Sequence, residues 1–133
     1  VLAIPHNGNL SNGMMFAETT VSGKALDKAY AERRAMWEPL YETTQIKGDA
    51  ESHPFLSPND EFADYENWDK TNLDYSQVKT KDMLPYEYSR SALKLGLKFK
   101  NELGNFPAMI SLSIHFNFSS AINFKIFINN SIF

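Results

Sequence analysis

Residues 41–54 read YETTQIKGDAESHP, and this segment decides how the chain is organised. Because its first half is rich in β-branched side chains, the sequence predicts a strand over residues 40–46. Gly48 breaks the pattern and opens a polar stretch that runs to about residue 79. Seven acidic residues and no lysine or arginine lie between residues 49 and 69. A loop of this length is uncommon within a domain and is often functional.

The segments on either side alternate between strand-like and helix-like patterns. Residues 2–5 predict a short buried strand, and residues 22–38 predict a helix that Pro39 ends. Residues 82–103 predict a second helix. This order favours an α/β fold with parallel strands covered by helices, in an open sheet or a barrel. In such folds the chemistry lies on the loops that follow the carboxyl ends of the strands.

The composition is that of a globular chain and excludes several classes of function. The net charge of −3 across 133 residues is too small to indicate a nucleic-acid partner. There is no cysteine, so neither a disulfide framework nor a thiolate metal site is available. No run of about 18 apolar residues predicts a membrane span.

Both ends of the chain depart from the expected composition. The chain opens with the apolar run VLAIP, which is typical of the middle of a strand. From residue 105 to residue 133 the only charged side chain is Lys125. We expect a fragment truncated at both ends, with an atypical apolar tail over residues 105–133 that reflects a shifted reading frame or a missing splice. The alternative is a genuine strand pair over residues 109–118 and 122–128.

His6 and the residues after the central strand are the candidates for chemistry. His6 follows the first predicted strand, where an imidazole can bind a divalent metal or cap backbone groups in the loop. In residues 42–54, carboxylates and an imidazole could bind zinc, manganese or iron, or supply a general base. Lys47 could hold a phosphate as a point charge. On composition alone, the segment is favoured to be an exposed polar loop of solvated charges.

Two further features carry weaker signals. The acidic loop does not have the spacing of an EF-hand, and its aromatic residues Phe62, Tyr65 and Trp68 are expected to hold the loop against the domain. Arg90 could reach a substrate oxyanion or pair with Glu87 one turn away.

Several blocks of the chain together resemble a known family. These blocks are AIPHNGN at residues 3–9, the segment 42–54, DEFA at residues 60–63, and YSRSAL at residues 88–93 with Gly96-Leu97. In this order they are similar to the domain-of-unknown-function family 3604 (DUF3604), over roughly residues 1–104. That family in turn resembles the PHP (polymerase and histidinol phosphatase) superfamily of metal-dependent phosphoesterases.

The resemblance implies a fold, a reaction class and a set of residues. It implies a partial parallel β/α barrel related to the TIM barrel, with divalent metal ions that activate a hydroxide for attack on an ester. His6 falls on a metal-ligand position. Glu51 and His53 are candidate catalytic residues, and Lys47 and Arg90 remain candidates for substrate binding.

The departures from the superfamily pattern limit what this chain is expected to do alone. Its opening His-x-His pair has no counterpart, and Ser113-Ile114-His115 has serine where an aspartate is expected. We therefore expect residues 1–104 to be a fragment of a hydrolase barrel for a small-molecule phosphoester or related ester, inactive as this chain. The alternative is a small non-enzymatic interaction module that uses the acidic aromatic loop.

Overall fold

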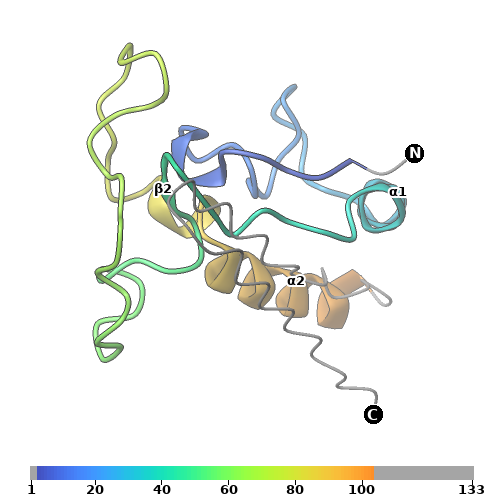
Figure 1. Cartoon of the computed structure of the whole chain (residues 1–133). Coiled ribbons are helices and arrows are strands. Elements are labelled where there is room, and N and C mark those ends of the chain that lie inside the picture. Colours follow the sequence, from blue (N-terminus) through green and yellow to red (C-terminus); the bar gives the residue numbers. More distant parts are fainter. Residues whose placement is uncertain (1–2, 104–133) are drawn as a thin grey trace.

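The structure is a computed structural model, and it describes residues 3–103 of the chain. Irregular backbone connects a few short elements. Figure 1 shows one α-helix at the right, the other across the lower centre and a long loop at the left. In chain order these are η1 (Gly8–Leu10), α1 (Lys28–Trp37), β1 (Thr44–Gln45), β2 (Gly48–Asp49), η2 (Leu84–Tyr86) and α2 (Ser89–Leu103). The predictions for the apolar tail at residues 105–133 and for the motif Ser113-Ile114-His115 concern residues outside those described.

Helix α1 is shorter than the sequence predicts. It begins after Asp27, whose carboxylate accepts a 2.7 Å hydrogen bond from the amide of Tyr30. The predicted start at Ser22 is wrong, because the chain turns back there: Thr19 and Ala25 form an antiparallel bridge. The aspartate cap satisfies an amide in the first helical turn that has no partner within the helix. The C-terminal end of the helix agrees with the prediction.

Helix α2 also starts later than expected, and its first turn is joined to the central segment. Residues 84–86 form the separate 3-10 turn η2, with Pro85 in it. The amides of Ser89 and Arg90 then donate to the carbonyls of Ala50 and Glu51, at 2.8 and 3.1 Å. Main-chain carbonyls thus cap the start of α2, and they fix it against the chain that follows β2.

The central segment is a tight hairpin where one longer strand was predicted. Strands β1 and β2 are antiparallel, with Thr44 opposite Asp49 and Gln45 opposite Gly48. Gly48 has a φ of 110°, and a Cβ there would lie 2.9 Å from the carbonyl oxygen of Glu66. Both the turn and the close approach of the long loop therefore require glycine at this position.

The first segment runs alongside the chain that leads into β1. The amide of Ala3 donates to the carbonyl of Trp37, and the amide of Glu42 donates to the carbonyl of Pro5. The buried strand predicted at residues 2–5 is wrong for the described residues 3–5, because they are not assigned to a strand and Ile4 is 44% exposed. The barrel remains a prediction, because the sheet within residues 3–103 consists only of the β1–β2 pair.

A small apolar core lies where the hairpin meets α2. Phe16, Tyr41, Ala50 and Ala92 form a buried cluster, with Met15 packed against it. The rings of Phe16 and Tyr41 meet edge to face, with centroids 5.0 Å apart. Burial of an aromatic ring of this size contributes about 1.5–3 kcal/mol, so this cluster is a principal apolar contribution to stability. Neither helix in residues 3–103 is long and apolar enough to cross a bilayer, which agrees with the sequence.

Candidate functional site

The residues that follow β2 form a compact turn at the start of α2. The carboxylate of Asp49 accepts the amides of Glu51 and Ser52, at 3.1 and 3.2 Å. Burial raises the pKa of Asp49 to about 6, against the two amide hydrogen bonds, which lower it. This turn holds Glu51 and His53 on one short piece of backbone, directly before they meet α2.

Arg90 lies between two carboxylates. Its Nε and Nη2 atoms both donate to Oε1 of Glu51, at 3.1 and 2.8 Å, and its Nη1 donates to Asp60. The alternative prediction that Arg90 pairs with Glu87 is wrong, because Glu87 is fully buried and pairs with Lys79. The amide of Phe62 and the guanidinium of Arg90 lower the pKa of Asp60. The Arg90 side chain is 44% exposed, so the three charges meet at the surface.

Both ring nitrogens of His53 have partners. Nδ1 accepts the amide of Phe55 at 3.1 Å, and Nε2 lies 3.4 Å from a carboxylate oxygen of Asp69. Because Nδ1 accepts a hydrogen bond, the neutral ring carries its proton on Nε2 and presents it to Asp69. The ring also packs against Tyr88, with centroids 5.4 Å apart. In this arrangement His53 fixes the start of the long loop.

His6 has a different environment. Its Nδ1 pairs with the carboxylate of Glu42, and its side chain is 53% exposed. Asn7 follows in a left-handed conformation, with a φ of 58°, and its side-chain oxygen accepts a hydrogen bond from Gln45. These two contacts fix the first loop to the chain entering the hairpin. They leave Nε2 of His6 without a hydrogen-bond partner among the described residues.

Lys47 lies in the turn between β1 and β2. Its carbonyl accepts a 3.1 Å hydrogen bond from the side-chain amide of Asn9. The described contacts give its side chain no role, so phosphate binding by Lys47 stays a prediction.

A set of buried polar residues lies behind the site, and sequence reasoning did not find it. The ammonium of Lys79 pairs with Glu87 and donates to the carbonyl of Asn9. Glu87 also accepts the amide of Gly13 at 3.1 Å, and its carbonyl accepts the hydroxyl of Tyr41 at 3.1 Å. We call Asn9, Tyr41, Lys79 and Glu87 the polar core. In a single sequence these residues carry no pattern that separates them from solvated surface residues.

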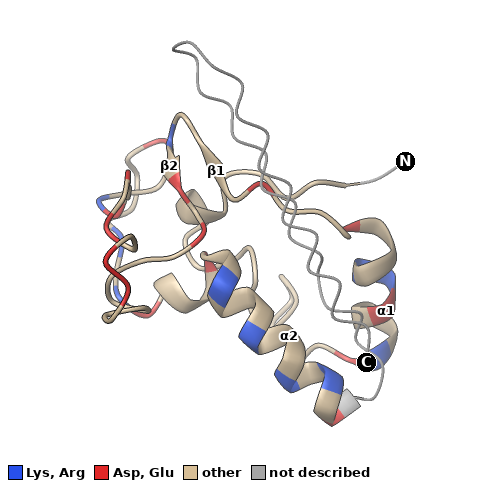
Figure 2. Ribbon diagram, turned by 60° about the horizontal axis from the view of Figure 1, so that its bottom comes forward, with Lys and Arg blue, Asp and Glu red and all other residues tan. Residues whose placement is uncertain are grey.

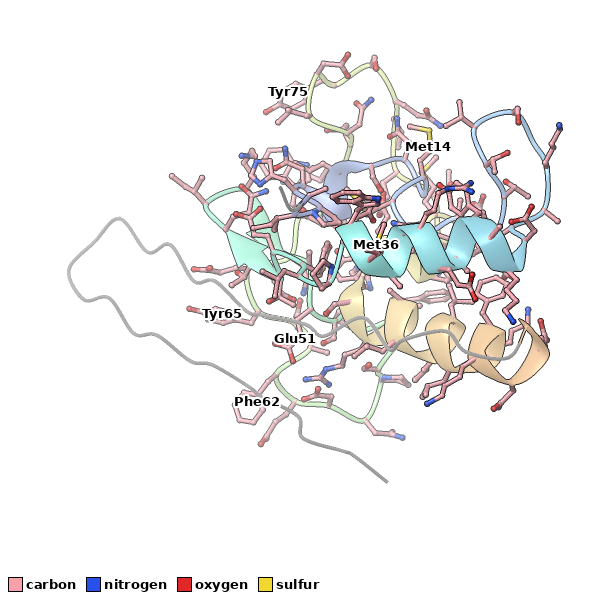
Figure 3. The ribbon with its side chains drawn as sticks, turned by 90° about the vertical axis from the view of Figure 1, so that its right-hand side faces the viewer. Met14, Met36, Glu51, Phe62, Tyr65 and Tyr75 are labelled. Atoms are coloured by element: carbon pink, nitrogen blue, oxygen red, sulfur yellow. The ribbon has the colours of Figure 1, made fainter. Side chains whose placement is uncertain are left out.

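The predicted site residues thus form two groups. Glu51, His53 and Arg90 are brought together at the start of α2, and Figure 3 shows Glu51 near the lower edge of that region. His6 pairs with Glu42, and no hydrogen bond or ion pair joins it to the other three within the described residues. No group of three or more His, Cys, Asp or Glu side chains within residues 3–103 could hold a metal ion.

Figure 2 shows that charged residues are unevenly distributed along the chain. Acidic residues gather on the long loop, and basic residues follow α2. The expectation that Phe62 and Tyr65 hold this loop against the domain is wrong, because they are 75% and 57% exposed. Trp68 is half-buried, and its indole N–H donates to the carbonyl of Thr71 at 3.1 Å. Hydrogen bonds within the loop and contacts of Asp60, Glu66 and Asp69 with Arg90, Asp49 and His53 therefore fix the loop. It presents aromatic rings to solvent.

In this chain, two helices and a hairpin support a turn that is rich in histidine and carboxylate side chains. Comparison with known proteins identifies the family of the chain. The family model described as "Protein of unknown function (DUF3604)" matches residues 1–113. The chain belongs to this family. No curated protein and no solved structure matches the chain.

Proposed function

We propose that this chain is part of a metal-dependent hydrolase that acts on a phosphoester or a related ester, with His6 as a metal ligand. The observation that carries the proposal is the pairing of His6 Nδ1 with Glu42 at a half-exposed position. Metal-binding histidines commonly donate one ring nitrogen to a carboxylate, which orients the ring and makes the other nitrogen a better ligand. Glu42, whose side chain is 13% exposed, is placed to have this effect on His6.

The described residues supply part of such a site. Zinc, manganese or iron would contribute Lewis-acid activation of water when bound. Within residues 3–103, however, His6 is not joined by two further ligands, so no step of hydrolysis can be assigned to a metal there. The family relationship to metal-dependent phosphoesterases is part of the proposal and rests on the resemblance of the sequence blocks.

Glu51 is the better placed of the two candidate catalytic residues. Arg90 donates two hydrogen bonds to Oε1 of Glu51, and Oε2 has no hydrogen-bond partner among the described residues. The Glu51 side chain is 50% exposed, so Oε2 can accept a proton from water. His53 has no ring nitrogen available for this, since the amide of Phe55 and the carboxylate of Asp69 occupy both. A substrate anion would have to share Arg90 with the carboxylates of Glu51 and Asp60.

Metal titration of the chain tests the role of His6. Isothermal calorimetry with zinc and with manganese should detect weak binding that His6→Ala abolishes. Glu42→Gln should weaken binding by about 10–100-fold, because the ring loses its orienting carboxylate. The matched control is His53→Gln, which removes an imidazole with no available nitrogen and should leave the titration unchanged. Unchanged affinity in His6→Ala would exclude the metal-ligand role.

A second function is favoured by one specific observation. Phe62, Tyr65 and Tyr75 are between 57% and 75% exposed on the long loop. Large exposed aromatic side chains are enriched at sites of protein–protein contact. The chain can therefore act as an interaction module through this loop, with or without hydrolase activity in the same protein.

A further inference from the structure

The most unusual part of the long loop is a small turn over residues 71–78, which we call the aromatic turn. Thr71 and Val78 close it as an antiparallel bridge. Figure 1 shows this part of the loop standing away from the helices, and Figure 3 shows Tyr75 at its outer edge. The ring of Tyr75 is 69% exposed.

The aromatic turn is fixed by its own hydrogen bonds. The Asn72 amide donates to the Gln77 carbonyl at 3.1 Å, and the Asn72 side chain accepts the Gln77 amide at 3.2 Å. Asn72 also donates to the hydroxyl of Ser76 at 2.9 Å, and that hydroxyl donates to Asp74 at 2.7 Å. A turn ordered in this way loses little conformational entropy when a partner binds.

Tyr75 has a backbone conformation that glycine or asparagine would adopt more easily. Its φ is 63°, in the left-handed region, where a bulky side chain is an outlier. The ring gains no burial in return, since it lies mostly in solvent. Its one aromatic neighbour among the described residues is Trp68, edge to face, with centroids 6.1 Å apart. The left-handed conformation of Tyr75 costs folding free energy, and it exposes the tyrosine ring to solvent.

The charge around the aromatic turn favours a cationic partner. Trp68 contacts Tyr75, and residues 66–78 around this contact hold three acidic side chains, Glu66, Asp69 and Asp74, and one lysine, Lys70. Hydrogen bonds from Ser76 lower the pKa of Asp74, so its carboxylate is ionised at neutral pH. Aromatic faces bind guanidinium and ammonium groups, and nearby carboxylates strengthen that preference. Exposed Leu73 and Val78 add apolar area on the same turn.

From these observations we infer that the aromatic turn is a docking surface for a protein segment that presents arginine or lysine beside apolar side chains. Tyr75 contacts the cation and the apolar neighbour, and the carboxylates steer the segment toward the turn. The inference develops the interaction function proposed above and does not depend on metal binding. Its failure would leave the role of His6 untouched, since the two are measured separately.

Fluorescence of Trp68 provides the test, in a Trp37→Phe background that removes the other tryptophan. The probe is a synthetic peptide that repeats Arg-Leu-Ser, and the control is the same peptide with Glu in place of Arg. We expect saturable binding of the basic peptide to the full chain, weakened by added salt. Tyr75→Ser should weaken it by about fivefold or more, whereas Val21→Ser, which removes a fully exposed apolar side chain outside the long loop, should not.

A glycine variant separates a recognition role from a structural one. Tyr75→Gly removes the ring and relieves the left-handed backbone, so it should raise the melting temperature while it weakens peptide binding. Equal losses in Val21→Ser and Tyr75→Ser, equal binding of the acidic peptide, or no binding of the basic peptide would each overturn the inference. So would concentration-dependent self-association in sedimentation that the basic peptide does not displace, because the occupant would then be a second copy of the chain.

Discussion

The polar core and the aromatic turn are both built from polar hydrogen bonds, but these bonds span very different lengths of chain. In the polar core, Lys79 binds Asn9 across 70 residues, and Glu87 binds Gly13 across 74. In the aromatic turn, the bonds of Asn72 and Ser76 span two to five residues. Long-range buried contacts therefore hold the molecule together, whereas the turn is a locally ordered attachment. Substitutions should separate the two regions by their effect on global stability.

Lys79→Met should have the largest effect. It leaves the fully buried carboxylate of Glu87 without its cation and removes a donor from the carbonyl of Asn9. Loss of one member of a buried ion pair costs about 3–5 kcal/mol. Urea denaturation followed by circular dichroism should show this loss in the free energy of unfolding. The control is Lys98→Met, which removes an exposed partner of Glu18 and should shift the midpoint little.

Gly8→Ala should come next, because it places an atom inside the polar core. A Cβ at this position would lie 1.8 Å from the hydroxyl oxygen of Tyr41 and 2.9 Å from the carbonyl oxygen of Glu87. Overpacking and loss of the Tyr41 hydrogen bond together should cost about 3 kcal/mol in the same denaturation experiment.

Two further variants check the cause of that loss. Gly8→Ala combined with Tyr41→Phe removes the hydroxyl that clashes, so it should recover part of the stability. Gly23→Ala has no atom within 4 Å of the new Cβ, and its φ of 77° leaves only backbone strain, about 1 kcal/mol. If Gly8→Ala and Gly23→Ala were equally costly, the packing of the polar core would not be the reason.

The contrast also explains how far the sequence could predict this molecule. Signals carried by neighbouring residues are sufficient to predict the two helices and the end of α1 before Pro39. Helix starts were predicted too early, because Asp27 and the carbonyls that cap α2 compete with Ser22 and Asp82. Such competition depends on where the rest of the chain lies.

For the site, the sequence identified residue types better than partners. Glu51 and Arg90 were both named as candidates, and they bind each other. The pairing of His6 with Glu42 and of Lys79 with Glu87 could not be predicted, since each depends on contacts the local sequence does not encode. Exposure of Phe62 and Tyr65 was also missed, because aromatic residues are more often buried than presented to solvent. The barrel and the metal site stay predictions.

The carboxyl group of Asp49 should have a smaller, pH-dependent effect on the free energy of unfolding. Its pKa is about 6 in the folded chain and 3.8 without the fold, so the folded state binds more protons between these values. Stability from this group is therefore present below about pH 4 and is lost as pH rises through 6. We expect about 1 kcal/mol, after allowance for partial exposure. Because other titrating groups also affect stability in this pH range, the measurement is the difference in the free energy of unfolding between the wild-type chain and Asp49→Asn. This difference does not change with pH if Asp49 has an ordinary pKa.

Phe62→Ser should have the smallest effect, and it completes the comparison. The ring is 75% exposed and belongs to the long loop, so its removal changes no buried contact. The free energy of unfolding should change by less than about 0.5 kcal/mol, against several for Lys79→Met. The free energies of unfolding of the two variants must be compared with each other, by urea denaturation under one set of conditions. A loss above about 1 kcal/mol for Phe62→Ser would mean that exposed aromatic residues of the long loop contribute to the global fold, and the contrast between buried long-range contacts and the exposed rings of the loop would fail.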